Sequence, residues 1–170
     1  MIIVLRLGHR LKRDERISTH CGLVARAFGA GKIIYSGDKD EKILETLKSV
    51  AERWGGKFSV EYDGSWRKVI NYNKKKKYII INLTMYGIPI EKNIKRIKKQ
   101  KNILAIIGSE KVPGEVYQLA DYNVAVTSQP HSEVAALAIF LNLLNKKKAF
   151  SNAKLKIVPQ AKGKKVKRLN

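Results

Sequence analysis

The stretch VAVTSQPHSEVAALAIFLNLL, residues 124–144, contains the transition that decides the fold. Asn123–Val126 predicts a short buried strand, and Val134–Leu144 predicts a helix that is apolar on nearly every side. A helix of this kind lies in the core or at a subunit interface. The connection between them, Thr-Ser-Gln-Pro-His-Ser-Glu, offers hydroxyl, amide, imidazole, carboxylate and backbone N–H groups. Because ligands of open α/β sheets bind outside the carboxyl ends of strands, this connection is a candidate ligand site.

The same alternation of strand and helix continues through the rest of the chain. Further apolar runs predict short buried strands at Ile2–Leu7, Ile33–Tyr35, Tyr78–Leu83 and Ile103–Ile107. Apolar residues at helical spacing predict an amphipathic helix across roughly 40–54, and Pro113–Leu119 predicts a shorter helix with proline in its first turn. Strands that alternate with helices indicate an α/β fold with a mostly parallel sheet flanked by helices.

The composition is that of a folded protein without a membrane span. The chain has 170 residues, of which 44% are hydrophobic, enough for one compact core. No apolar run reaches the ~20 residues that a spanning helix needs, and the N-terminus lacks the features of a signal peptide. Cys21 is the single cysteine, so an internal disulfide is excluded and a reducing compartment fits. We therefore expect a cytoplasmic protein.

The charge predicts the class of partner. Thirty-five Lys and Arg residues stand against fourteen Asp and Glu residues, which gives a net charge of +21. The basic residues form blocks at 6–16, 67–77 and 92–101 and in the segment from Lys146 onward. Such an excess favours a polyanionic partner, and nucleic acid comes first. A solvated Lys-rich surface is the alternative. A membrane surface is not favoured, because the sequence contains no basic amphipathic helix with bulky apolar anchors.

Two familiar motifs can be excluded. Gly29-Ala30-Gly31-Lys32 is not a phosphate-binding P-loop, because no Ser or Thr follows the lysine. It is not a Rossmann dinucleotide-binding fingerprint either, because it follows a helical segment instead of a strand. We interpret it as a helix end and turn. His9, His20 and His131 have no metal-binding spacing, so no metal is expected. We expect Cys21 to be a small buried side chain and not a nucleophile.

Six short strings together resemble one family. They are LRLGHR (5–10), RISTH (16–20), LVARAFGA (23–30), NLTMYG (82–87), GSEKVP (108–113) and VAVTSQPHSEVAALAIFLN (124–142). Their order and content are similar to the SPOUT superfamily, and more closely to its archaeal tRNA cytidine-56 2′-O-methyltransferases. The resemblance covers roughly residues 2–145. It implies a fold with a C-terminal trefoil knot, a rare exception to unknotted topology.

The resemblance also implies an activity and a site. Members of the family transfer a methyl group from S-adenosylmethionine to a ribose 2′-oxygen of the tRNA T-loop, and they act as homodimers. A methyltransferase domain would then span residues 1–146, followed by a basic, mobile tail at 147–170. The residues that the resemblance implies for cofactor binding are Leu83, Gly108, Ser109, Glu110, Lys111, Val112, Val126, Thr127, Ser128, Gln129, Pro130, His131, Ser132 and Glu133.

Arg26 matches the arginine of the first family motif and is the residue expected to act in catalysis. A guanidinium stays protonated, so its expected role is to hold a phosphate and stabilise the developing alkoxide. The proton acceptor implied is either a neighbouring phosphate or His131. Two alternatives stay open at this point: a non-catalytic RNA-binding protein and a Rossmann-type methyltransferase. The latter would need a glycine-rich loop after the first strand, and Leu7-Gly8-His9 does not supply one.

Overall fold

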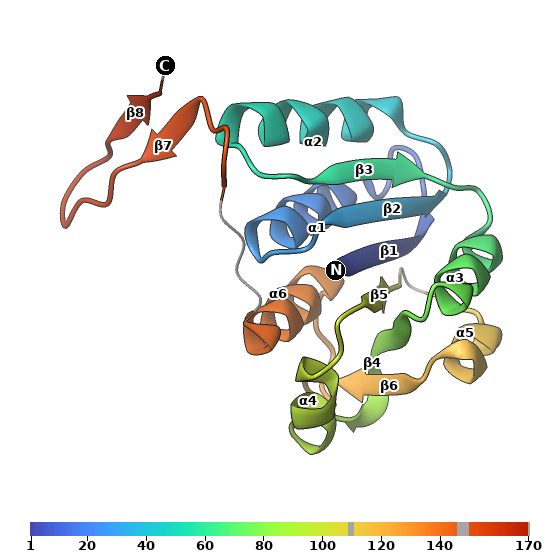
Figure 1. The fold of residues 1–170 in the computed structure, drawn as a ribbon. Helices are drawn as coiled ribbons and strands as arrows, with labels where there is room; N and C mark the ends of the chain where they lie inside the picture. Colours follow the sequence, from blue (N-terminus) through green and yellow to red (C-terminus); the bar gives the residue numbers. More distant parts are fainter. Residues whose placement is uncertain (109–110, 146–149, 170) are drawn as a thin grey trace.

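The computed structural model describes residues 1–108, 111–145 and 150–169, and it contains a parallel sheet flanked by helices on both faces (Figure 1). The sheet has six strands in the order β3-β2-β1-β5-β4-β6, and every neighbouring pair is parallel. Its strands are β1 (Ile2–His9), β2 (Lys32–Gly37), β3 (Ser59–Tyr62), β4 (Ile79–Pro89), β5 (Ile103–Ile107) and β6 (Tyr122–Ala125). The helices are α1 (Glu15–Ala27), α2 (Glu41–Trp54), α3 (Trp66–Lys75), α4 (Ile90–Lys98), α5 (Gly114–Leu119) and α6 (Glu133–Leu144). The predicted α/β class is confirmed.

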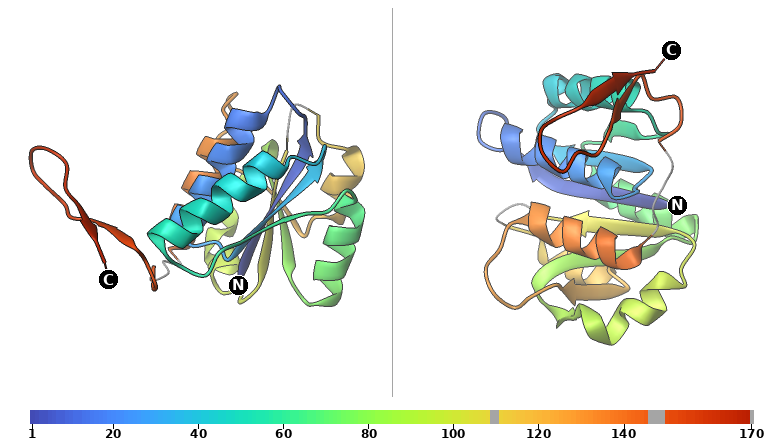
Figure 2. Two further views of the ribbon diagram at one scale, coloured as in Figure 1. Left: turned by 90° about the horizontal axis from the view of Figure 1, so that it is seen from above. Right: turned by 90° about the vertical axis from the view of Figure 1, so that its left-hand side faces the viewer.

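Alternation along β1 distributes its side chains between two apolar cores. Ile2 and Val4 pack under α1, α2, α4 and α6, whereas Ile3 and Leu5 pack under α3 and α5. The right-hand view of Figure 2 shows α2, α1, α6 and α4 side by side over the first of these faces. Since both faces are covered, the strands appear in the sequence as continuous apolar runs, and for this reason they were predictable.

Five elements were not among the sequence predictions. In β3 only Val60 is fully buried, so its apolar signal is short. The helices α3 and α4 lie within segments whose basic residues dominate the sequence. The last two elements, β7 (Leu155–Ile157) and β8 (Val166–Arg168), form an antiparallel hairpin that extends away from the body of the molecule (Figure 2). It lies in the segment for which a basic tail was predicted.

The strands β4 and β6 lie unusually close together. Leu83 and Ile88 both pair with Val124, so the intervening residues of β4 leave the ladder and return to it. A Cβ on Gly87 would lie 2.5 Å from the Val124 nitrogen, closer than any side chain allows. Glycine is therefore required where the two backbones approach. This geometry is consistent with the trefoil knot that the resemblance implies.

The ends of the helices follow local sequence signals. Gly29, with φ of 92°, follows the end of α1, and Lys32 begins β2, which confirms the predicted helix end and turn. The Ser132 hydroxyl accepts a hydrogen bond from the Ala135 nitrogen at 3.2 Å and caps α6. Within the part of the chain that the structure describes, no helix is long and apolar enough to cross a membrane.

Candidate active site at the carboxyl edge of the sheet

The candidate site lies where the chain leaves neighbouring strands toward opposite faces of the sheet. The strands β1 and β5 are neighbours, yet β1 leads to α1 on one face and β5 leads to α5 on the other. Such a divergence leaves a crevice at the carboxyl ends of the strands, where open α/β sheets bind ligands. The segment at 126–132, after β6, and the loop after β1 lie on the same side of the molecule (Figure 2, right). The topology thus places the predicted cofactor loops at this edge.

A buried ion pair connects β1 to the end of the loop at 126–132. Arg6 lies on β1 with only 1% of its side chain exposed, and its Nη2 is 3.0 Å from Oε1 of Glu133, the first residue of α6. Arg6 Nη1 also donates to the Leu7 carbonyl oxygen at 2.5 Å. Glu133 was predicted to contact the cofactor, and the structure gives it a partner within the protein. The pair fixes the point at which the loop enters α6.

Val112 packs closely against Gly108, at the end of β5. A Cβ at Gly108 would lie 2.0 Å from Cγ2 of Val112, so the absence of a side chain is what permits Val112 to pack there. The predicted contact residues Ser109 and Glu110 lie outside the described residues. Lys111 is exposed and Val112 is half-buried at the start of the segment that leads to α5. Gly108 and Val112 therefore act together in shaping this loop.

The loop at 126–132 presents polar groups to solvent. Val126 is half-buried, whereas Thr127, Ser128, Gln129, Pro130, His131 and Ser132 are exposed. The Thr127 hydroxyl accepts a hydrogen bond from the Gln129 nitrogen at 3.2 Å, which shapes a short turn. Leu83, at the bend of β4, pairs with Val124 of β6 and is 7% exposed. The hydroxyl, amide and backbone groups of the loop suit hydrogen bonding to a polar ligand.

A chain of hydrogen bonds links β4, β6 and α5 close to these loops. Asn82 Nδ2 donates to Asn123 Oδ1 at 2.9 Å, and Asn123 Nδ2 donates to the Tyr117 carbonyl oxygen at 2.9 Å. The Tyr117 and Thr84 hydroxyl oxygens are 3.3 Å apart. These hydrogen bonds tie β4, β6 and α5 together beside the strand ends from which the loops leave.

Arg26 lies at the opposite edge of the sheet within one chain. It is in the last turn of α1, and the Gly31 nitrogen, a few residues later, donates to the Ile2 carbonyl oxygen at the amino end of β1. Arg26 Nη2 donates to the Gly55 carbonyl oxygen at 2.5 Å, and its Cζ lies 4.8 Å from the centroid of the Phe150 ring. Burial lowers the pKa of its guanidinium. The structure therefore does not bring Arg26 together with the cofactor loops of its own chain.

Two further expectations from the sequence concern Cys21 and metal binding. Cys21 is fully buried, which confirms the expectation of a small buried side chain, and burial raises the pKa of its thiol to about 12. In residues 1–108, 111–145 and 150–169, no group of three or more His, Cys, Asp and Glu side chains could hold a metal ion.

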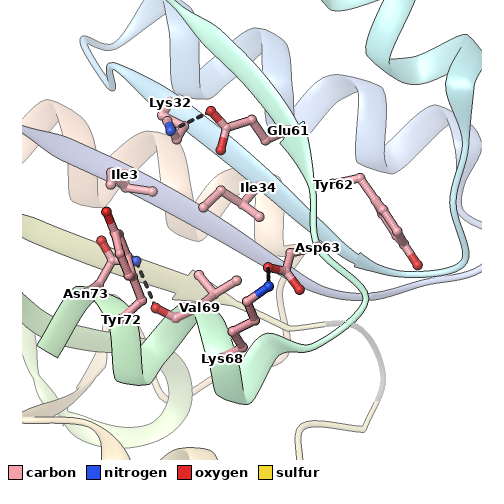
Figure 3. Close-up of a pocket in the computed structure, with 10 residues that line it drawn as sticks. All are labelled: Ile3, Lys32, Ile34, Glu61, Tyr62, Asp63, Lys68, Val69, Tyr72 and Asn73. Atoms are coloured by element: carbon pink, nitrogen blue, oxygen red, sulfur yellow. Dashed lines mark hydrogen bonds and ion pairs between the residues drawn. The ribbon is translucent and has the colours of Figure 1, made fainter. Parts of the chain in front are cut away.

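One cleft lies away from the candidate site. It has a volume of about 330 Å³ and lies between β2, β3 and α3 (Figure 3). Its polar side chains satisfy one another: Lys32 Nζ is 2.5 Å from Glu61 Oε1, and Lys68 Nζ is 3.8 Å from Asp63 Oδ2. Asn73 Nδ2 donates to the Val69 carbonyl oxygen at 2.8 Å. Lys32, Glu61 and Asn73 thus have partners inside the protein, whereas the pair of Lys68 with Asp63 is long and exposed.

Sequence reasoning missed Arg6. The available signal was a charged residue between Leu5 and Leu7 in a strand predicted to be buried, since a buried charge needs a partner. The sequence could not supply the partner, because Glu133 lies near the other end of the chain.

Comparisons with known proteins show the family of the chain. Residues 54–167 match the family described as tRNA ribose 2′-O-methyltransferase, aTrm56. The tRNA (cytidine(56)-2′-O)-methyltransferase of Thermococcus kodakarensis is 56% identical over 174 residues, which cover 98% of this chain and 96% of the relative. The protein of the same name from Methanopyrus kandleri is 51% identical over 98% of this chain and 96% of its own length.

A solved structure supports the fold independently. The SpoU methyltransferase AviRb from Streptomyces viridochromogenes, in complex with the cofactor AdoMet, superposes with a TM-score of 0.61 at 14% identity. The superposition covers 85% of this chain and 56% of that chain. The fold is therefore that of the SPOUT methyltransferases, and the Rossmann-type alternative is excluded. The family profile and the full-length relatives show that the chain belongs to the archaeal tRNA ribose 2′-O-methyltransferase family, aTrm56.

Proposed function

We propose that the protein transfers a methyl group from S-adenosylmethionine to the 2′-oxygen of cytidine 56 in the T-loop of tRNA. The observation that carries the proposal is the identity of 56%, over nearly the full length of both chains, to a relative named for this reaction. The net charge of +21 supports a tRNA substrate. A non-catalytic RNA-binding protein would share this charge but would not need the proposed cofactor loops at 108–112 and 126–132.

The loops at 108–112 and 126–132 are the proposed cofactor site. Thr127, Ser128 and Gln129 would supply hydroxyl, amide and backbone partners, and Leu83 would supply an apolar contact from the bend of β4. Gly108 keeps the first loop in the conformation in which Val112 packs against it. Glu133 acts from below through its ion pair with Arg6, so its proposed role is to hold the loop.

The chemistry requires a methyl donor, an aligned oxygen and a place for one proton. S-adenosylmethionine supplies a methyl group on a sulfonium sulfur. The ribose 2′-oxygen forms the new bond to carbon and loses its proton, and the bond between carbon and sulfur breaks. A phosphate of the substrate or His131, which is exposed in the loop at 126–132, is the proposed proton acceptor. Arg26 is proposed to stabilise charge on the oxygen or a phosphate, but only if a second copy of the chain brings it to the site.

The proposal is tested by methyl transfer to tRNA transcripts. Purified protein should incorporate methyl groups into a transcript with cytidine 56, and a transcript with a 2′-deoxy residue at that position should accept none. Calorimetry should show binding of S-adenosylhomocysteine without RNA. Tight tRNA binding with neither cofactor binding nor methyl transfer would instead support the non-catalytic alternative.

We also propose that the protein works as a homodimer. Leu137, Leu141 and Leu144 of α6 are buried in the chain's own core, so much of the apolar character of this helix is accounted for within one chain. Its outer side still presents Ile139 at 46% exposure. Such a side suits an isologous contact between two copies. Sedimentation should give a dimer for the natural chain and a lower mass for Ile139→Glu, whereas a stable monomer of the natural chain at micromolar concentration would contradict the proposal.

A further inference from the structure

A basic groove lies between the first turns of α1 and α2. We define it by Lys12, Arg13, Arg16, His20 and Lys42, all exposed, which line a depression of about 430 Å³. The Lys and Arg side chains come from three segments: the loop after β1, one face of α1 and the start of α2. Arg16 and His20 are one helical turn apart and therefore point the same way. Positively charged side chains from three separate segments thus gather around one depression. A basic surface with evenly spread charges would not show such a cluster.

The loop that carries Lys12 and Arg13 is held in a defined conformation. Arg10 Nε is 3.0 Å from Asp14 Oδ2, and the Leu11 nitrogen donates to Asp38 Oδ2 at 3.0 Å. Burial raises the pKa of Asp14, but the hydrogen bond and charge of Arg10 outweigh it, so the pKa lies below its ordinary value. Asp14 thus stays ionised and keeps the loop closed. The groove is preorganised, which lowers the entropy that a ligand must remove.

The two carboxylates that also line the groove are engaged within the protein. Asp40 accepts a hydrogen bond from the Ile43 nitrogen at 3.2 Å, and its other oxygen lies 3.3 Å from His9 Nε2. Glu15 Oε2 is 3.9 Å from Lys42 Nζ, across a long and exposed pair that gives little stability. Lys42 can therefore exchange Glu15 for a stronger anion at small cost. The groove as a whole presents positive charge to a ligand.

The position of the groove identifies the anion. The helices α1 and α2 begin directly after the carboxyl ends of β1 and β2, so the groove shares its edge of the sheet with the loops at 108–112 and 126–132. We propose that the basic groove binds the sugar–phosphate backbone of tRNA beside the nucleotide being methylated. The inference rests on the proposed function and adds to it a place where the substrate is held. Contacts of this kind position the RNA, whereas they do not read its sequence.

The test compares two triple variants with the same change in charge. One is Lys12→Gln/Arg16→Gln/Lys42→Gln in the groove. The control is Lys48→Gln/Lys74→Gln/Lys75→Gln, which removes three exposed cations from the outer part of α2 and from α3. Affinity for a tRNA transcript is measured over a range of salt concentrations. Each lost phosphate contact should lower the slope of log K against log salt by about 0.7–0.9, so the groove variant should lose about 2 to 3 in slope.

The control variant should keep a slope close to that of the natural chain, and both variants should bind S-adenosylhomocysteine normally. Equal loss in the two triple variants would mean that only net charge matters, and the groove would be rejected. An unchanged slope in the groove variant would reject it as well. Methyl transfer by the natural chain is measured in parallel, because its absence would overturn the proposed function while leaving a groove-dependent loss of tRNA binding in place.

Discussion

Replacing Glu133 by Gln should destabilise the protein far more than a typical change at a helix start. Glu133 is the ionic partner of Arg6, whose side chain is 1% exposed. After the substitution, the buried guanidinium keeps its hydrogen bond to the Leu7 carbonyl oxygen but loses its counter-charge. Breaking one side of a buried pair costs ~3–5 kcal/mol, and because Glu133 itself is 21% exposed, the lower end applies.

A loss of about 3 kcal/mol has a measurable signature. For a chain of this size each 1 kcal/mol shifts Tm by roughly 2–4 °C, so a fall of about 6–12 °C is expected. Urea denaturation should give the same free energy difference. Cofactor affinity should also fall, since the loop at 126–132 loses the anchor at its end.

The matched control is Glu61→Gln, which breaks the pair between Glu61 of β3 and Lys32 of β2. Glu61 is 49% exposed, and pairs of this type contribute about 0–1 kcal/mol. Adding Arg6→Met to Glu133→Gln should cost less than the sum of the single variants, because the buried charge is gone. A loss for Glu133→Gln as small as that of Glu61→Gln would refute the view that this pair fixes the loop.

Four further predictions follow from the site and the tail. Gly108→Val should weaken S-adenosylhomocysteine binding and spare tRNA binding, because its side chain collides with Val112; calorimetry that gives unchanged cofactor affinity in the folded variant would contradict the assigned loop. Removing residues 147–170 should weaken tRNA binding and flatten its salt dependence by about 0.7–0.9 per lost contact, whereas an unchanged slope would make the tail a passive extension. Cys21 should react with a thiol reagent only as fast as the protein unfolds, since its thiol is buried and its pKa is about 12; fast labelling of the native protein would count against its placement. Arg26→Ala should lower single-turnover methyl transfer by roughly 10²–10³-fold, with little rescue by Arg26→Lys, and a near-normal rate would remove Arg26 from the mechanism.

The sequence predicts those parts of the fold that local patterns specify. β5 is a continuous apolar run, and β1 is one from Ile2 to Leu5, because helices cover both faces of the sheet. The helix α2 shows a clear amphipathic repeat. The helix α4 was predictable, since Ile90, Ile94 and Ile97 repeat at helical spacing. It was missed because its lysines and arginine led the segment to be interpreted as a basic block. The hairpin of β7 and β8 was not predictable, because its two short strands are separated by a loop and carry little apolar signal.

For the candidate site, the sequence locates the loops but not what supports them. A polar connection between a buried strand and a buried helix is visible at 126–132 without any structure. The ion pair of Arg6 with Glu133 and the packing of Val112 on Gly108 depend on distances that only the folded chain supplies. Resemblance to a family indicates which loops bind the cofactor, whereas the structure indicates what holds them.

The family motif and the structure of a single chain indicate different roles for Arg26. Its guanidinium contacts the Gly55 carbonyl oxygen and the Phe150 ring, beside an apolar cavity of about 750 Å³ between α1, α2 and the hairpin. Within one chain, these contacts describe an anchor for the segment that leads to β7. The carboxyl edge, where methyl transfer is proposed, lies at the other end of α1. A catalytic role for Arg26 thus requires a second copy whose α1 reaches the loops of the first. The proposed catalytic role of Arg26 therefore depends on the proposed homodimer, whereas the homodimer does not depend on that role. A fully active monomer would leave Arg26 with its structural role alone.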